Sequence, residues 1–304
     1  MRGLPLALAA ALLGVLAALG AGCGTQASAV SGCPGTGRAA YASRRPIPHF
    51  RHVIVIVFEN TEANDIFGSF AAPTFNELAR RYAKLTRYCG VAHPSLPNYL
   101  ALVSGSTQGL TDNCDDCRFD ARNLADSLEA AHRSWKSYAE GLPSPGYTGG
   151  DTGPYIKHHN PFVYFRDVLS SRKRLERFVP VTAFARDLAA RALPDFALVV
   201  TGEGHNMSDG AIKSGDSWLH AFVRPLLALP GSVVFVTFDE GDKSDHAGGG
   251  GHVATLVLGP LVRPHSSSDA PLSHYSLLRT IEDSWQLPRL GRSASAAPIR
   301  GIWR

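Results

Sequence analysis

Two hydrophobic segments of the sequence each end in a pair of polar residues that could bind a cation. The run 52–58 is followed by Glu59-Asn60, and the run 232–238 is followed by Asp239-Glu240. Runs of β-branched residues this long are typical of strands buried on both faces of a parallel sheet. Ligands bind at the carboxyl ends of such strands, and oxygen atoms gathered there suit a hard divalent cation. The alternative interpretation is that each pair simply opens a solvated loop.

Ser95 lies in the segment His93-Pro94-Ser95-Leu96-Pro97-Asn98, which has the features of a helix start. Proline is favoured in the first helical turn, and free N–H groups with the helix dipole favour a phosphate there. A serine in this position could act as a nucleophile if a bound metal lowered its pKa. Otherwise it would be an ordinary N-cap. Asn98, one turn along, could donate to a phosphoryl oxygen or simply lie on the surface.

Three loops carry histidines. His158-His159 lies at the end of a Gly/Pro-rich loop over 141–160, and we expect at most one of the two to act directly. His205 follows a further predicted strand. The loop 241–252 contains four consecutive glycines and ends at His252. It could be a mobile lid, a second metal loop or a solvated loop, and it is not a nucleotide-binding P-loop, because no Gly-Lys-Ser/Thr follows.

The elements that must position these residues alternate between strands and helices. Strands are predicted over 52–58, 85–89, 135–139, 196–201, 232–238 and 254–258, and helices over 74–83, 97–105, 123–132, 172–193, 217–229 and 274–285. This alternation predicts an α/β fold with a largely parallel central sheet flanked by helices and right-handed crossovers.

Composition sets further bounds on the fold and the partners. The chain has 304 residues, of which 44% are hydrophobic, so it can form one large α/β domain or two small ones. The net charge is only +4, and no Lys/Arg block alternates with aromatic residues. Nucleic-acid binding therefore has no support.

The N-terminus has the organisation of a targeting segment. Residues 1–22 combine Arg2, an apolar stretch over 4–19 and small residues ahead of Cys23, as in a signal peptide. The end of this segment is similar to a lipobox, with Gly20 at the place where leucine is usual. Lipidation of Cys23 or plain cleavage near Ala21 would both place the protein outside the cytoplasm. Residues 23–49 then form a flexible tether suited to an anionic membrane surface, and residues 50–304 form the folded domain.

The cysteines agree with export. If Cys23 carries a lipid, Cys33, Cys89, Cys114 and Cys117 remain. An even number suits two disulfides in an oxidising compartment, although their connectivity stays open. Cys114 and Cys117 could instead form half of a zinc site, but no matching pair follows.

Five motifs, taken together and in order, resemble a known family. They are the strand ending in Glu59-Asn60, the segment His93–Tyr99, His159-Asn160-Pro161, Phe238-Asp239-Glu240 and Gly251-His252-Val253. They resemble the bacterial and fungal phosphoesterase family of acid phosphatases and non-specific phospholipases C, within the alkaline-phosphatase-like superfamily. The resemblance spans Arg51 to Pro288.

The resemblance implies a fold, a cofactor and a set of site residues. It implies an alkaline-phosphatase-like fold and one divalent metal ion of unknown identity, held by Glu59, Asn60, Asp239 and Glu240. Ser95 matches the nucleophile, and Asn98, His159 and His252 are expected to bind the substrate. The family usually has a histidine where this chain has Ser208. We therefore expect His205 or His159 to protonate the leaving group, with His205 favoured.

These observations predict an exported, metal-dependent phosphoesterase. The expected reaction is acid-phosphatase-like hydrolysis of a phosphorylated small molecule or lipid through a phosphoserine. One alternative is a phospholipase C-type phosphodiesterase, although the chain has no room for the extra C-terminal domains of many such enzymes. Another is a non-catalytic surface lipoprotein that kept the fold.

Overall fold

The computed structural model describes residues 46–208 and 211–304. The predicted signal peptide over 1–22, Cys23, Cys33 and most of the predicted tether over 23–49 lie outside the described residues. Among the helices formed by the described residues, none is both long enough and apolar enough to cross a membrane.

The domain is built on an eight-stranded sheet with the strand order β5-β4-β6-β1-β7-β8-β2-β9. Neighbouring strands are parallel except at β8, which runs antiparallel to both β7 and β2. Strands β3 and β10 form a separate parallel pair. The bounds are β1 His52–Phe58, β2 Ala83–Leu85, β3 Tyr88–Cys89, β4 Trp135–Ala139, β5 Phe178–Pro180, β6 Phe196–Val200, β7 Ser232–Phe238, β8 Thr255–Leu258, β9 Ser266–Ser268 and β10 Leu272–Ser273. The predicted largely parallel α/β fold is confirmed.

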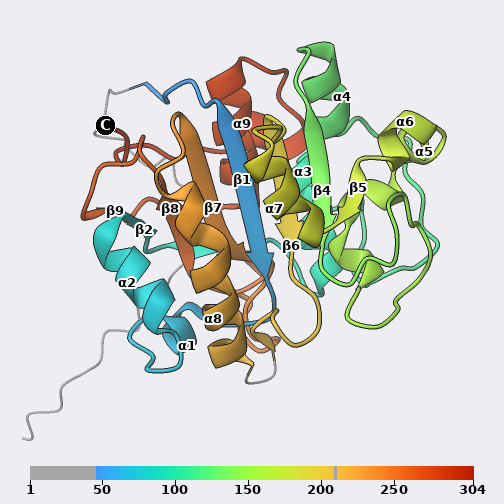
Figure 1. Cartoon of the computed structure of the whole chain (residues 1–304). Helices are drawn as coiled ribbons and strands as arrows, with labels where there is room; N and C mark the ends of the chain where they lie inside the picture. Colours follow the sequence, from blue (N-terminus) through green and yellow to red (C-terminus); the bar gives the residue numbers. More distant parts are fainter. Residues whose placement is uncertain (1–45, 209–210) are drawn as a thin grey trace, which may run out of the picture. The chain divides into compact units, whose positions relative to one another are not determined.

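Helices cover both faces of the sheet (Figure 1). One face carries α2 (Pro73–Arg81), α7 (Thr182–Ala189) and α8 (Ile212–Val223), and the other carries α3 (Ser95–Ser104), α4 (Leu124–Ala130) and α9 (His274–Trp285). Helix α2 packs against α8, and α3 packs against α9. Shorter helical turns are α1 Ala63–Ile66, η1 Lys157–His159, η2 Pro161–Tyr164, α5 Arg166–Leu169, α6 Arg172–Leu175, η4 Arg224–Leu226, η5 Ala247–Gly249 and η6 Gly291–Ala294.

The pairing of β1 with β7 brings the two acidic strand ends together. The strands are parallel and in register from His52 opposite Ser232 to Phe58 opposite Phe238. All side chains of β7, and all of β1 after His52, are buried, because helices cover both faces of these central strands. The next residues, Glu59 and Asp239, therefore leave the sheet side by side.

The predicted helix over 172–193 is wrong. This segment contains α6, then strand β5, then α7. Phe178 and Val179 are buried and pair with Ser137 and Tyr138 of β4, and the energy of that packing outweighs helical periodicity. Other boundaries shift: the predicted strand 85–89 divides into β2 and β3, the predicted helix 217–229 begins earlier as α8, and β9 and β10 were not predicted.

The four-glycine loop packs closely against residues 90–92, which follow β3. The N–H of Gly90 donates to Gly251 O at 3.0 Å, and the N–H of Gly241 donates to Gly250 O at 2.8 Å. A Cβ atom on Gly250 would lie 2.5 Å from Ala92 O. Glycine is required here because two backbone segments approach more closely than any side chain allows.

A disulfide joins Cys114 to Cys117. The disulfide interpretation is therefore confirmed for this pair, and the zinc interpretation is wrong, because a bonded pair of sulfurs offers no thiolate ligand. Cys89 is also disulfide-bonded.

We predict that Gly90→Ala lowers the stability of the domain. A Cβ on Gly90 would lie 2.5 Å from Gly250 O and 2.9 Å from Asp239 O, both backbone atoms. Forcing these segments apart should cost about 1–3 kcal/mol of unfolding free energy, measured by denaturant titration. Gly150→Ala is the matched control, because a Cβ there meets no atom within 4 Å. Equal stability of the two variants would contradict the close-packing argument.

Candidate functional site

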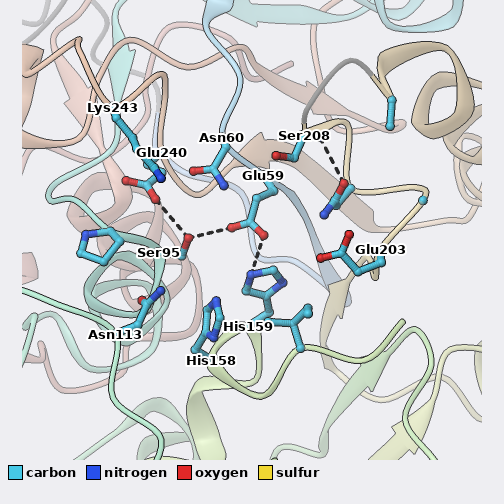
Figure 2. Close-up of a pocket in the computed structure, with 15 residues that line it drawn as sticks. Glu59, Asn60, Ser95, Asn113, His158, His159, Glu203, Ser208, Glu240 and Lys243 are labelled. Atoms are coloured by element: carbon cyan, nitrogen blue, oxygen red, sulfur yellow. Dashed lines mark hydrogen bonds and ion pairs between the residues drawn. The ribbon is translucent and has the colours of Figure 1, made fainter. Parts of the chain in front are cut away.

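Ser95, the first residue of α3, places its hydroxyl between two carboxyl groups (Figure 2). Its Oγ lies 2.8 Å from Glu59 Oε1 and 3.0 Å from Glu240 Oε1. A hydroxyl has one proton and can donate to only one of these oxygens at a time. The arrangement therefore requires either a second proton on a carboxyl group or a cation among the three side chains.

The carboxyl groups are removed from water. Glu59, Asp239 and Glu240 are 4%, 0% and 1% exposed. Burial raises the pKa of Glu59 to about 7, and the charge of Glu240 adds to the effect. Burial, followed by the charge of Asp239, raises the pKa of Glu240 to about 7. Burial and then the charge of Glu59 hold the pKa of Asp239 well above its usual range. Each shift has the sign expected when like charges are crowded in a poorly solvated place.

Asn60 turns the chain sharply at the end of β1. Its backbone has φ of 46°, a left-handed conformation that asparagine tolerates better than most residues. Its N–H donates to Asp239 Oδ1 at 3.2 Å. Two oxygens, Asn60 Oδ1 and Asp239 Oδ2, are buried without a hydrogen-bond partner. Such buried unpaired oxygens are costly, so they mark a place where a further ligand would be stabilised.

His159 holds Glu59 from the side away from Ser95. Its Nε2 lies 2.5 Å from Glu59 Oε2, and its ring stacks on Tyr99 of α3 with centroids 5.0 Å apart. Burial lowers the pKa of His159 to about 4, so the ring is neutral near pH 7. His159 therefore orients the carboxyl group of Glu59, and both His158 and His159 line the cavity described below.

His93 plays the corresponding part for Glu240 and was not predicted as a site residue. Its Nδ1 pairs with Glu240 Oε2, and its Nε2 lies 2.8 Å from Asp245 O. The position of His93, two residues before Ser95 in the same motif, was the available signal. Contact with Glu240 could not be deduced, because the partner lies 147 residues further along the chain.

Above Ser95 lies a cavity of about 410 Å³. Its walls include Glu59, Asn60, Ser95, Glu240 and the two adjacent histidines, together with three side chains that were not predicted: Asn113, Glu203 and Lys243. Figure 2 shows Lys243 near Glu240 and Glu203 on the opposite wall. Glu203 follows β6, so its position after a third strand end was the signal for it. Lys243 lies in the loop that follows Asp239-Glu240.

The start of α3 offers fewer N–H groups to a phosphate than the sequence suggested. The N–H of Leu96 donates to Asn113 Oδ1 at 2.9 Å, and Pro97 has no N–H. Asn113 therefore occupies part of the anion-binding capacity of this helix end.

Asn98 does not line the cavity, so its predicted contact with phosphate is not supported. Its Oδ1 accepts the N–H groups of Val91 and Ala92 at 2.8 and 3.2 Å. Its Nδ2 donates to Ala92 O and Pro94 O at 2.7 and 3.3 Å. A side chain whose polar atoms are all used in this way fixes the loop before Ser95 and has nothing left for a substrate.

His205 and His252 are also absent from the walls of the cavity. His205 Nδ1 pairs with Glu140 Oε1 at 2.7 Å, and the ring faces a neighbouring surface depression. His252 Nε2 lies 3.0 Å from Thr86 O, behind the glycine loop. Ser208, at the place of the family's usual histidine, does line the cavity. The predicted proton donation by His205 and substrate binding by His252 therefore receive no support.

The side-chain oxygen atoms at the ends of β1 and β7 are suitable ligands for a hard divalent cation. Among residues 46–208 and 211–304, no group of three or more His, Cys, Asp or Glu side chains is arranged to hold a metal ion. The oxygen donors here instead include an amide and a hydroxyl: Asn60 Oδ1 and Asp239 Oδ2 lack partners, and Ser95 Oγ bridges the glutamates. A divalent cation would satisfy these oxygens and relieve the repulsion between the carboxylates.

Comparison with proteins of known sequence shows clear relatives. The Phosphoesterase family model matches residues 70–288. The chain is 35% identical over 299 residues to a phosphatidylinositol-3-phosphatase of Mycobacterium tuberculosis, covering 97% of this chain and 94% of the relative. It is 31% identical over 257 residues to a phosphate-repressible acid phosphatase of Penicillium chrysogenum, covering 80% of this chain but only 61% of that longer protein.

Comparison with solved structures confirms the alkaline-phosphatase-like fold. A Vibrio parahaemolyticus protein of the alkaline phosphatase superfamily superimposes with a TM-score of 0.58 at 12% identity, covering 83% of this chain and 71% of the other. A phosphonate monoester hydrolase of Agrobacterium radiobacter gives 0.52 at 16% identity, covering 86% and 79%. The family match and the two named phosphatases agree with a serine held among buried carboxylates: the chain belongs to the Phosphoesterase family and is a phosphoric ester hydrolase.

Proposed function

We propose that this protein is a metal-dependent phosphomonoesterase that acts outside the cytoplasm through a phosphoserine at Ser95. The observation that carries the proposal is the position of the Ser95 hydroxyl, within 3.0 Å of two buried glutamates at the floor of a cavity. An activated nucleophile is expected to have its hydroxyl hydrogen-bonded to a neighbouring base in this way.

Monoester hydrolysis is favoured over the phospholipase C-type alternative by the relatives. The two named above are called a phosphatidylinositol-3-phosphatase and an acid phosphatase, and both names describe removal of a terminal phosphate. The non-catalytic alternative is disfavoured because Glu59, Ser95, Asp239 and Glu240 are all retained and converge.

In the proposed reaction, Glu59 and Glu240 hold the hydroxyl of Ser95 so that its oxygen faces the cavity. His159 and His93 fix these carboxyl groups from outside, so the hydroxyl keeps one orientation. A divalent cation bound among these oxygens supplies the positive charge that lowers the pKa of the hydroxyl and neutralises the phosphoryl oxygens.

As the bond from Ser95 Oγ to phosphorus forms, the hydroxyl proton passes to the carboxylate of Glu59, 2.8 Å away. The bond from phosphorus to the substrate alcohol breaks, and the departing alkoxide takes a proton from water. The hydroxide left behind cleaves the phosphoserine and releases inorganic phosphate, and Glu59 returns its proton to Ser95 Oγ. Lys243 on the cavity wall attracts the anionic substrate.

We predict that Ser95→Ala lowers kcat on p-nitrophenyl phosphate by roughly a thousandfold or more, because the covalent step is lost. Rapid quenching of the parent with labelled substrate should trap phosphate on Ser95. Ser104→Ala is the matched control: it is a buried serine on the same helix that bonds Leu100 O and should keep normal turnover. Label on another residue, or an unimpaired Ser95→Ala variant, would refute the assignment.

We predict that Glu59→Gln and Asp239→Asn each lose the metal ion, because each removes a charge from the proposed ligand set. Elemental analysis of the purified variants measures this directly. The parent should also be stabilised by added metal, by about 2.7 kcal/mol at a hundredfold excess over Kd. Glu203→Gln, on the opposite wall of the cavity, should retain the metal. Full metal occupancy in both Glu59→Gln and Asp239→Asn would rule out the proposed metal site.

Export and lipid anchoring rest on the sequence of residues 1–49 alone. We predict that Cys23→Ala releases the protein from membranes, because a lipid on Cys23 would be the membrane anchor of the mature chain. Fractionation of cells that express the parent or the variant measures the change. Recovery of the parent entirely in the medium would show plain secretion instead.

A further inference from the structure

Two surface depressions continue from the cavity over Ser95 along helix α8. The first, of about 680 Å³, shares Ala211 with the cavity. The second, of about 280 Å³, shares Trp218 with the first. The three hollows therefore follow one another along the surface, from the cavity edge at Ala211 to Pro225, just beyond the end of α8.

Five residues that line the two depressions lie on one stripe along α8. Ala211, Ser214, Trp218, Ala221 and Pro225 all line these hollows, and they are spaced three, four, three and four residues apart. This spacing places them on one helical face. Because each residue advances the helix by 1.5 Å, Trp218 lies roughly 10 Å along the axis from Ala211. The path therefore follows α8 from its N-cap, Ala211, to Pro225 in the turn after it.

The far hollow is a groove between α7 and α8 lined only by apolar residues. Phe184 of α7 meets Phe222 of α8 with ring centroids 4.6 Å apart. Phe222 in turn stacks on Trp218 at 4.6 Å. Trp218 is anchored to the core by an edge contact with Phe58, at the end of β1. Ala185 and Ala221 are exposed at the rim of this groove.

The near hollow has polar side chains between the cavity and the groove. It is lined by His205, Lys213, Ser214 and Ser217, together with Ala211 and Trp218, which it shares with the neighbouring hollows. His205 is held in place by Glu140. Along α8 the surface therefore changes from the cavity over Ser95, through hydroxyl, imidazole and ammonium groups, to an aromatic groove. The same order of chemistry occurs in a phosphorylated glycerolipid, which has a phosphate, an ester-linked glycerol and an acyl chain.

We propose that the groove between α7 and α8 binds the acyl chain of a phosphorylated glycerolipid whose phosphate lies at Ser95. This inference rests on the proposed phosphomonoesterase function and adds the class of substrate. The polar hollow accommodates the glycerol and ester groups, and the two aromatic side chains of α8 cover the chain. Short substrates do not reach the groove, because the polar hollow separates it from Ser95.

The test is the dependence of kcat/KM on chain length, measured with monoacyl glycerol phosphates kept below their aggregation concentrations. For the parent, kcat/KM should rise once the chain reaches the groove, by up to about fourfold for each methylene that is fully buried. Activity on p-nitrophenyl phosphate, which has no chain, is measured in parallel. The ratio of kcat/KM for the long-chain substrate to kcat/KM for p-nitrophenyl phosphate measures the contribution of the groove. This ratio does not depend on the enzyme concentration.

Ala185→Asp and Ala221→Asp place a charge at the rim without removing any core side chain. Each should lower the ratio of long-chain to p-nitrophenyl activity at least tenfold. Ala189→Asp is the matched control: it lies on the same helix as Ala185, is exposed, and is not part of the groove. It should keep the parent's ratio. Unfolding curves confirm that the variants are folded.

Two results would overturn the inference. One is a parent whose kcat/KM does not change with chain length, and the other is a ratio that is the same in the rim variants and in the parent. In either case, retained hydrolysis of p-nitrophenyl phosphate would leave the proposed function standing. If the metal-loaded parent hydrolyses no phosphomonoester, the proposed function and this inference both fail.

Discussion

The crowding of three carboxyl groups at the ends of β1 and β7 is the constraint on which the rest of the site depends. In-register parallel pairing makes Glu59 and Asp239 neighbours, and Glu240 follows directly. Helices on both faces exclude the water that would screen them. The pKa values of all three groups are raised, because holding negative charges close together away from water is unfavourable. Carboxyl groups crowded in this way are typical of functional sites, where a proton, a cation or a substrate offsets their repulsion.

Several distant segments are arranged to hold the crowded groups in place. His274 of α9 is fully buried and pairs with both Asp239 O and the hydroxyl of Tyr88, which links the end of β7 to β3. Burial lowers the pKa of His274 to about 4, so it adds no charge. On the other side, Gly90 and Gly250 let two backbone segments meet without side chains between them. Catalytic geometry here is therefore a property of the whole carboxyl edge of the sheet.

The sequence predicted what local patterns determine and missed what depends on contacts between distant segments. The runs that form β1 and β7 could be recognised because strands buried on both faces are apolar throughout, and their acidic ends followed. The roles of His93, Asn113 and Lys243 could not, because their neighbours come from remote loops. The surroundings of Asn98 could not be predicted for the same reason: its position one turn after Ser95 is local, but its hydrogen bonds to residues 91–94 depend on how that loop folds back. Strand β5 was missed because pairing with β4 outweighed helical periodicity.

The charges around the cavity also imply an order of binding in the proposed reaction. Glu59, Glu203 and Glu240 line the cavity with Asp239 behind them, and among its described lining residues Lys243 is the one side chain with a fixed positive charge. A phosphate dianion entering this field alone would be repelled by the carboxylates. A divalent cation reverses the local sign and makes the same cavity attractive to the anion. Since coupling between two ligands is reciprocal, the substrate must in turn tighten the hold on the cation. In the proposed reaction, the buried carboxylates would thus make the binding of the cation and the binding of the substrate depend on each other.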